Sequence, residues 1–190
     1  MLILASQSPR RKELLGLLNM PFTVRAADID EAMDPAKPVS DEVARVSLAK
    51  ALAVPRSPED VVIAADTVVV LDHAVLCKPA DEAAAKDMLR RLSGRSHQVM
   101  TGITVLQGEK HLSHTEITEV IFRELTEQEI CRYVATGEPM DKAGAYGIQG
   151  GAALFAQGLK GDYYNVMGLP VCRLVQMLRH LAPQITEEFP

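Results

Sequence analysis

The chain has 190 residues and a formal net charge of −5 at pH 7, with 24% charged and 47% hydrophobic residues. These values are ordinary for a soluble globular protein. They predict a single domain over residues 1–190, which is either one compact body or an elongated body with two lobes. The negative charge argues against a general nucleic-acid binder, which needs a basic surface to displace counterions. Because tryptophan is absent and only 4% of residues are aromatic, we expect aliphatic side chains to fill the core.

The cysteines and the N-terminus bear on the cellular compartment. Cys77, Cys131 and Cys172 lie far apart and show no metal-ligand spacing, so we expect free thiols in a reducing environment. The apolar residues 1–5 are far too few for a signal sequence or a membrane span and are better interpreted as a first strand. We therefore expect a cytoplasmic protein that does not act at a membrane.

The first predicted strand, residues 2–5, leads into a helix that begins at Ser8 and Pro9. Ser8 is a good N-cap, and proline fits the first helical position. The buried side of this helix is expected to consist of Leu14, Leu15, Leu17 and Leu18. A strand that turns into a helix N-terminus offers free backbone N–H groups to an anion. Arg10 and Arg11 oppose the helix dipole, so a bound phosphate explains them better than helix stability does.

A strand at residues 22–24 is followed by an acidic cluster at residues 28–31, which by itself is best interpreted as a solvated loop. A second helix is expected from about Ser40 to Ala53. One arc of this helix contains Val43, Val46, Lys50 and Ala53, which are spaced by three or four residues. Lys50 therefore lies along an apolar side. A lysine there usually extends its ammonium to solvent, but it can equally reach into a cleft.

Asp66 interrupts the apolar run of residues 61–71, whose β-branched residues predict a strand through the core. An ionised carboxylate there costs on the order of several kcal/mol unless a metal or another cation compensates it. Asp66 is therefore a strong candidate for a functional residue. The alternative is a structural aspartate at a turn between two shorter strands.

Mixed strands and helices with several hairpins predict an α/β fold with a mixed sheet. The remaining elements are expected to be a turn at Asp72 and His73, a strand at 74–76, a helix from Asp81 to Leu92, paired strands at 97–106 and 115–122, a capping-box helix from Thr126 to Val134, a glycine-rich loop at 141–150, a strand at 153–155, a loop at 161–169 and a last helix from Pro170.

Several of these side chains suit the hydrolysis of a phosphoanhydride. Cations would bind the phosphates, and carboxylates would hold a hard metal ion such as Mg²⁺ and orient or deprotonate the attacking water. The candidates are Ser6, Ser8, Arg10, Arg11, Lys50 and Lys78 for phosphate, and Glu31 and Asp66 as carboxylates. No Walker-type loop or dinucleotide-binding fingerprint is present in the sequence.

A series of motifs carries a more specific signal. They occur in this order: ASQSPRRKELL (5–15), ADTVV (65–69), KP (78–79), LSG (92–94) with His97 and TG (101–102), GEP (137–139) with DKAG (141–144), and NVMGLP (165–170). From residue 2 to about 178 the chain resembles the Maf family of septum-formation-inhibitor homologues, which are nucleoside triphosphate pyrophosphatases. The resemblance implies an elongated, two-lobed fold related to the inosine triphosphate pyrophosphatases, with the active-site cleft between the lobes. It also implies cleavage to the monophosphate and pyrophosphate with a divalent cation, Mg²⁺ or Mn²⁺.

Matched position by position, the resemblance assigns roles. Asp66 corresponds to the catalytic proton acceptor for water, and Glu31 and Asp66 to the residues at the metal. The phosphate-binding positions are Ser6, Arg10, Lys50 and Lys78, and the positions associated with substrate choice are Arg10, Thr67 and Gln149. The loop at 144–150 is similar to the branch that hydrolyses dTTP and UTP rather than 7-methyl-GTP. A glutamine amide can pair with a pyrimidine carbonyl and N3–H together.

Two positions depart from the family pattern. His73 follows Asp72 where an aspartate-glycine turn is common, and Cys77 stands where glycine or glutamate often precedes the Lys-Pro pair. Neither removes a proposed functional group. The competing hypothesis is a nucleotide-binding regulator of cell division that does not turn over its ligand. Asp66 favours the enzyme, because binding alone needs no water-activating carboxylate. The expected partner is a small nucleotide, and a homodimer is left open.

Overall fold

The computed structural model describes residues 1–26 and 28–187. The chain divides into two compact units. The first unit consists of Met1–Asp66, Thr101–Glu116 and Gly168–Pro190, and the second of Thr67–Met100 and Ile117–Met167. Each unit is therefore assembled from segments that are distant in the sequence. The expectation of a single domain over residues 1–190 stays a prediction.

The predicted mixed α/β fold is confirmed. The strands are β1 (Leu2–Leu4), β2 (Phe22–Val24), β3 (Val61–Leu71), β4 (Ala74–Leu76), β5 (Ser96–Gln107), β6 (Lys110–Phe122) and β7 (Ala156–Lys160). The helices are α1 (Pro9–Gly16), α2 (Val39–Ala53), α3 (Glu82–Leu92), α4 (Glu127–Val134), α5 (Tyr163–Met167) and α6 (Val171–Leu181). Short 3₁₀ turns are η1 (Glu138–Asp141), η2 (Ala143–Ala145), η3 (Gly151–Leu154) and η4 (Pro183–Ile185).

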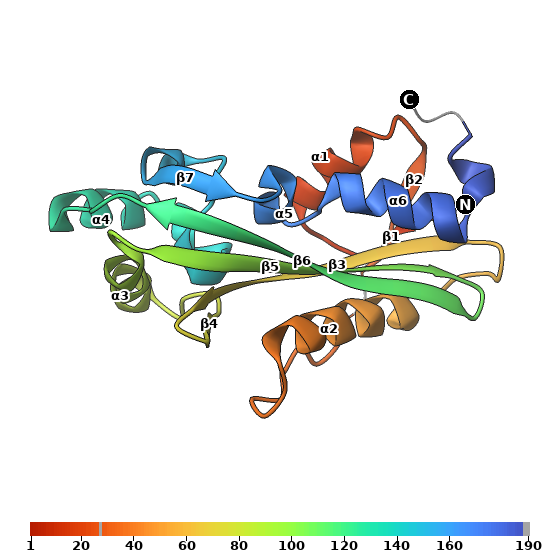
Figure 1. The fold of residues 1–190 in the computed structure, drawn as a ribbon, viewed down its shortest axis with the longest axis horizontal. Coiled ribbons are helices and arrows are strands. Elements are labelled where there is room, and N and C mark those ends of the chain that lie inside the picture. Colours follow the sequence, from red (N-terminus) through yellow and green to blue (C-terminus); the bar gives the residue numbers. More distant parts are fainter. Residues whose placement is uncertain (27, 188–190) are drawn as a thin grey trace. The chain divides into compact units, whose positions relative to one another are not determined.

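The seven strands of the described residues belong to one sheet in the order β2-β1-β3-β5-β6-β7, with β4 paired to β3 (Figure 1). Strand β1 runs parallel to both β2 and β3, whereas β4 pairs antiparallel with β3 and β7 antiparallel with β6. The sheet is therefore mixed. Strand β3 passes from the first unit into the second between Asp66 and Thr67.

In the first unit, α2 lies on one face of the sheet and α1 and α6 lie on the other (Figure 1). The small aliphatic core that includes strand β1 and helix α2 consists of Ile3, Ala5, Ala51, Val54, Val62, Ala64 and Leu106. Gly102 of β5 lets α2 come close, because a Cβ atom at this glycine would lie 2.3 Å from the carbonyl oxygen of Val43. The absent side chain thus sets how closely α2 approaches the sheet.

In the second unit, the core is not purely aliphatic, contrary to the sequence-based expectation. Phe122 packs edge to face against Tyr146 and Phe155, and Tyr133 packs in the same way against Phe155. His97 joins this cluster by edge contacts with Phe122 and Tyr146. These four aromatic residues belong to one core cluster together with buried residues of α3 and α4.

Four local expectations were wrong. Leu17 lies beyond the end of α1 and is 55% exposed, and Ala53 at the end of α2 is also exposed. The strand expected at 153–155 is absent, because residues Gly151–Leu154 form a 3₁₀ turn and the strand begins at Ala156. The loop expected at 161–169 contains the short helix α5. The first error arises because the helical pattern was extended past the end of α1, and the second lies at the last residue of α2.

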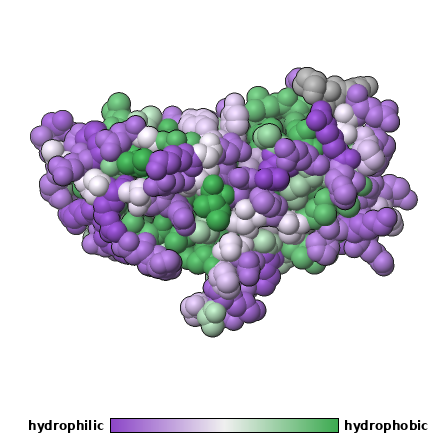
Figure 2. Space-filling view, viewed as in Figure 1, coloured by the Kyte–Doolittle hydropathy of each residue, from purple (hydrophilic) through white to green (hydrophobic). Residues whose placement is uncertain are grey.

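Hydrophilic residues cover much of the face shown in Figure 2, and hydrophobic residues reach the surface there in several separate groups. Scattered apolar side chains are normal on folded proteins. Within the described part of the chain, no helix is both long and apolar enough to cross a membrane. The three cysteines are free thiols.

Candidate active site

Asp66 lies in the first unit on an unbroken strand, and its side chain is 10% exposed. The alternative of a turn between two shorter strands is therefore wrong. One carboxylate oxygen, Oδ1, accepts a hydrogen bond of 2.7 Å from Nζ of Lys50. This cation provides the compensation that a carboxylate in an apolar strand requires.

Lys50 does not extend into solvent. It reaches from α2 to Asp66, its side chain is 12% exposed, and its Nζ also lies 2.8 Å from Oε1 of Glu31. The carboxylate of Glu31 is 58% exposed. The acidic loop is thus more than a solvated segment, because one of its carboxylates converges with Asp66 on a single ammonium group.

Helix α2 also holds the acidic loop in place. The buried carboxylate of Glu42 accepts hydrogen bonds from the backbone N–H of Asp34 at 2.9 Å and from Nε of Arg45 at 3.1 Å. Arg45 in turn donates to the carbonyl oxygen of Ala32 at 2.7 Å. The hydrogen bond from Arg45, followed by that from Asp34, lowers the pKa of Glu42, which therefore stays ionised. Glu31 is anchored by these contacts on its C-terminal side.

Helix α1 begins as the sequence predicts. Ser8 is its N-cap and accepts a hydrogen bond from the backbone N–H of Arg11, with Pro9 in the first turn. Oγ of the buried Ser6 accepts hydrogen bonds from the backbone N–H of Ser8 at 3.2 Å and from Nη1 of Arg11 at 3.3 Å. The strand-to-helix turn is therefore ordered by side chains at the point where an anion would bind.

Arg11 is the residue whose position the sequence did not reveal. Its Nε donates to the carbonyl oxygen of Gly168 at 2.8 Å. Burial lowers the pKa of Arg11, and so does the positive charge of Arg10, while the negative charges of Asp66 and Glu31 raise it. The family resemblance pointed to Arg10, but Arg11 is the arginine held by Ser6 and Gly168 within the field of Asp66. Adjacent arginines look equivalent in sequence, and only the direction of each side chain from the helix separates them.

The other candidates belong to the second unit. Thr67 follows Asp66 on β3 and is half-buried, and Lys78 is exposed just after β4. The carbonyl oxygen of Cys77 accepts a hydrogen bond from the backbone N–H of Gly144 at 3.2 Å, which ties the segment before Lys78 to the glycine-rich loop. Gln149 is exposed on the loop between η2 and η3. The expected cleft between the lobes stays a prediction.

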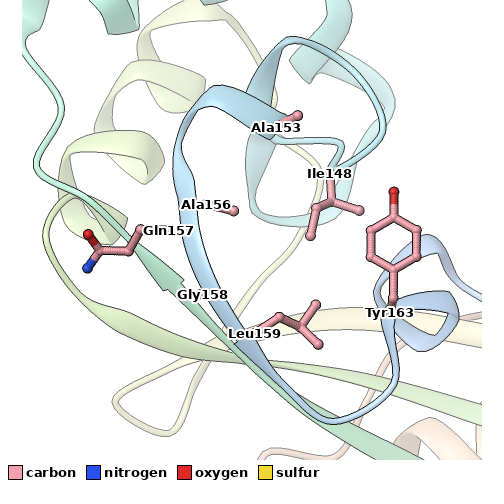
Figure 3. Close-up of a pocket in the computed structure, with 7 residues that line it drawn as sticks. All are labelled: Ile148, Ala153, Ala156, Gln157, Gly158, Leu159 and Tyr163. Atoms are coloured by element: carbon pink, nitrogen blue, oxygen red, sulfur yellow. The ribbon is translucent and has the colours of Figure 1, made fainter.

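A pocket of about 350 Å³ lies within the second unit, and the loop between η2 and η3 forms part of its lining. Its lining consists of Ile148, Ala153, Ala156, Gln157, Gly158, Leu159 and Tyr163. Ile148, Leu159 and Tyr163 gather on one side of β7, whereas the amide of Gln157 points to the other side (Figure 3). The residue that precedes Gln149 is thus part of a mostly apolar surface.

The side chains available as metal ligands limit how a metal ion could be held. Among residues 1–26 and 28–187, no group of three or more histidine, cysteine, aspartate or glutamate side chains could hold one. Glu31 and Asp66 nevertheless have oxygens within 2.8 Å of the same Lys50 Nζ. Mg²⁺ typically binds one or two carboxylates together with substrate phosphates and water. The two carboxylates therefore fit a metal that arrives with a phosphate ligand.

Comparison with known proteins identifies the family. A model of the family described as Maf-like protein matches residues 1–181. The chain belongs to the Maf family. A Symbiobacterium thermophilum protein named dTTP/UTP pyrophosphatase is 54% identical to this Maf protein over 178 residues, which cover 93% of this chain and 92% of that protein. A Bacillus cytotoxicus protein of the same name is 51% identical over 178 residues and covers 93% of each chain.

A solved structure resembles the fold as well. The structure of a HAM1 protein from Coxiella burnetii matches with a TM-score of 0.50 at 15% sequence identity, over 94% of this chain and 98% of that chain. At this identity the likeness concerns the fold alone. It agrees with the predicted relation to the inosine triphosphate pyrophosphatase fold.

Proposed function

We propose that this Maf protein is a nucleoside triphosphate pyrophosphatase that hydrolyses dTTP and UTP to the monophosphate and pyrophosphate. The observation that carries the proposal is the nearly buried carboxylate of Asp66, held at 2.7 Å by Lys50. The names of two relatives that are 54% and 51% identical support the substrate class. Gln149 supports a pyrimidine, because its amide can pair with a carbonyl and N3–H at once.

Asp66 is suited to accept a proton from water. In the free protein its Oδ1 is bound to Lys50. A triphosphate that takes Lys50 as its counterion releases this oxygen, which can then accept the proton of the attacking water. Attack at the α-phosphorus breaks the bond to the bridging oxygen, and pyrophosphate leaves with that oxygen. General-base catalysis of this kind typically contributes about 100- to 10,000-fold in rate.

The phosphates would be bound by groups from several elements. The N-terminus of α1 presents backbone N–H groups, with Arg11 held behind them by Ser6 and Gly168. Lys50 neutralises charge from α2, and Lys78 is proposed to add a further positive charge from the second unit. Charges that are already in place stabilise the transition state with little reorganisation.

We further propose that Glu31 and Asp66 hold a divalent cation, Mg²⁺ or Mn²⁺, together with a substrate phosphate. When bound, such a cation neutralises charge that develops on the phosphate oxygens. The proposed compartment is the cytoplasm, which suits three free thiols and a nucleotide substrate.

The direct test is pyrophosphate release measured with dTTP, UTP, ATP, GTP and 7-methyl-GTP, with and without MgCl₂ or MnCl₂. We expect turnover that requires the cation and is fastest with dTTP and UTP. Nucleotide binding without pyrophosphate release by the unaltered protein would favour the competing hypothesis of a non-catalytic regulator. A preference for 7-methyl-GTP would place the chain in the other branch of the family.

A further inference from the structure

Gln149 lies on a loop that a single carboxylate ties down near both ends. We call residues 147–151 the Gln149 loop. Oε2 of Glu138 accepts a hydrogen bond of 3.0 Å from the backbone N–H of Gly151. Oε1 of Glu138 accepts another of 3.0 Å from the hydroxyl of Tyr133, whose oxygen in turn accepts one of 3.2 Å from the backbone N–H of Gly147. All of these residues belong to the second unit.

The loop backbone lies directly against this carboxylate. A Cβ atom at Gly150 would lie 2.0 Å from Oε1 of Glu138, and one at Gly151 would lie 3.2 Å from the ring of Tyr133. Neither glycine has a positive φ, so close approach rather than backbone conformation requires them. Any side chain at position 150 would displace either Glu138 or the loop.

The residues that hold the loop are themselves fixed. Tyr133 is 5% exposed and packs edge to face against Phe155. Burial raises the pKa of Tyr133, so its hydroxyl keeps its proton and remains a donor to Glu138. Nζ of Lys142 donates to the carbonyl oxygen of Glu138 at 2.6 Å, which anchors the backbone of the glutamate as well. Glu138 therefore connects a rigid core to an exposed loop.

We propose that Glu138 is a positioning residue that sets the pyrimidine preference by holding the Gln149 loop, without touching the nucleotide. Both of its carboxylate oxygens are engaged by loop and core. Gln149 is exposed, so burial does not fix the position of its side chain. An amide that reads a base must be held in place before binding, because ordering a mobile loop on binding lowers affinity. The inference rests on the proposed function, in which Gln149 recognises the pyrimidine base of the nucleotide.

The test compares Glu138→Ala with Glu138→Gln and Tyr133→Phe. The alanine variant removes the acceptor of the Gly151 N–H and of the Tyr133 hydroxyl, so it frees the Gly151 end directly and loosens the Gly147 end through Tyr133. The glutamine variant keeps an acceptor for Gly151, and the phenylalanine variant releases only the Gly147 end. Glu127→Ala is the matched control, because Glu127 pairs with Arg90 in the same unit and touches neither end of the loop. The measurements are kcat and KM for dTTP, UTP, ATP and GTP, and amide hydrogen exchange at Gly147 and Gly151.

We expect Glu138→Ala to lower kcat/KM for dTTP and UTP by about tenfold or more, mainly through KM, since the hydrogen bonds from Gly151 and Tyr133 to the carboxylate are both lost. The purine nucleotides should change little, so the preference shrinks. Glu138→Gln should recover most of it, and Tyr133→Phe should fall between. Exchange at Gly147 and Gly151 should accelerate in the alanine variant, while exchange in β3 stays as in the unaltered protein.

Equal losses on all four nucleotides, or an unchanged preference despite faster exchange, would overturn the proposal. If the unaltered protein releases no pyrophosphate or prefers purines, the proposed function fails instead. In that case exchange at the two glycines still decides whether Glu138 holds the loop, and unchanged exchange in Glu138→Ala contradicts that role directly.

Discussion

Asp66 lies inside an apolar strand with Lys50 beside it, and this arrangement makes a sharp substitution possible. Asp66→Asn keeps the size of the side chain and an acceptor for Lys50 but cannot take a proton from water. We expect turnover to fall by about 100- to 10,000-fold, as when a general base is lost, with triphosphate binding largely retained. Steady-state pyrophosphate release and equilibrium binding measure the two effects.

The control for this substitution is Asp87→Asn, which changes an exposed aspartate of α3. It should behave as the unaltered protein does. An Asp66→Asn variant that retained half of the original kcat would refute the assignment of Asp66 as the base.

Phosphate recognition should be shared among Arg10, Lys50 and Lys78, which lie on separate elements. Alanine at each position should lower kcat/KM, and double variants should lose less than the product of the single losses, as expected for cations that bind a common ligand. Lys50→Ala should also destabilise the fold by about 3–5 kcal/mol, because it leaves the carboxylate of Asp66 buried without its partner. Kinetics at low and high salt and thermal unfolding test both expectations.

If all three alanine variants match the unaltered protein at every salt concentration, these side chains are solvated surface charges. Arg11→Ala belongs in the same series. A larger loss from Arg11 than from Arg10 is expected, since the structure directs Arg11 toward Ser6 and Asp66.

Gln149→Glu tests whether Gln149 recognises the pyrimidine base. Glutamate keeps the acceptors but loses the amide donor that a pyrimidine carbonyl needs. We expect the preference for dTTP and UTP over the purine nucleotides to shrink by about 1–3 kcal/mol in terms of kcat/KM, as when a paired polar contact is lost. Side-by-side measurements with the four nucleotides decide the matter, and equal losses on all four would assign Gln149 to loop structure.

At the scale of elements, the packing of α2 on the sheet supports the active site. In Gly102→Ala, the new methyl group would lie 2.3 Å from the carbonyl oxygen of Val43, so α2 must move away from the sheet. Overpacking of this kind typically costs about 1–3 kcal/mol. Because α2 also carries Lys50, we expect a lower Tm together with a reduced kcat/KM.

Gly16→Ala is the matched control, because a Cβ atom at Gly16 would meet nothing within 4 Å. Its Tm should stay the same or rise slightly, and its activity should not change. A Gly102→Ala protein as stable and active as this control would show that α2 tolerates the displacement.

The elements differ in how well their sequences predicted them. The bounds of β3 and α3 were predicted correctly, because an uninterrupted apolar run and clear caps define each one locally. Strand β7 was displaced by several residues, since its start depends on pairing with β6, with a register shift between Ile121 and Phe122, rather than on its own pattern. Helix α5 has only five residues, and a segment that short has little periodicity of its own.

The residues of the candidate site also differ in how well the sequence predicted their positions. Asp66 was evident as a charge in an apolar strand, whereas the position of Lys50 on the apolar side of α2 left open whether its ammonium reaches solvent or a cleft. Lys50 has a nearly buried side chain and Glu31 a largely exposed one, and no local pattern predicts the contact between them. The inward position of Arg11 depends on the carbonyl group of Gly168, which is 157 residues away.

At the scale of the whole molecule, His97 should make stability depend on pH. It is 3% exposed, its Nε2 lies 2.8 Å from the hydroxyl of Tyr146, and its Nδ1 has no hydrogen-bond partner among the described residues. Burial lowers the pKa of His97 from 6.5 to about 4. Between these values the unfolded chain binds a proton that the folded protein excludes, so stability is full above pH 6.5 and falls toward pH 4. The gap corresponds to about 3 kcal/mol.

Tm measured between pH 4 and 7 tests this expectation, with His97→Phe as the variant that removes the titration. The variant should have a flatter profile across this range, even if its Tm at pH 7 is lower because the contact with Tyr146 is lost. His111→Asn, at an exposed position on β6, should keep the profile of the unaltered protein. A His97→Phe protein with the original slope would place the acid sensitivity elsewhere.

The placement of Lys50 between two carboxylates has a consequence for the fate of the product. In the proposed function, nucleotide binding would be an ion exchange, in which the ammonium of Lys50 leaves carboxylate oxygens for phosphate oxygens. Pyrophosphate offers the same oxygens as the triphosphate tail of the substrate, so it would compete for the same lysine. The carboxylates of Asp66 and Glu31 would then pair with Lys50 again and displace pyrophosphate. The charge of Glu31 should therefore influence how quickly the protein is ready for another turnover.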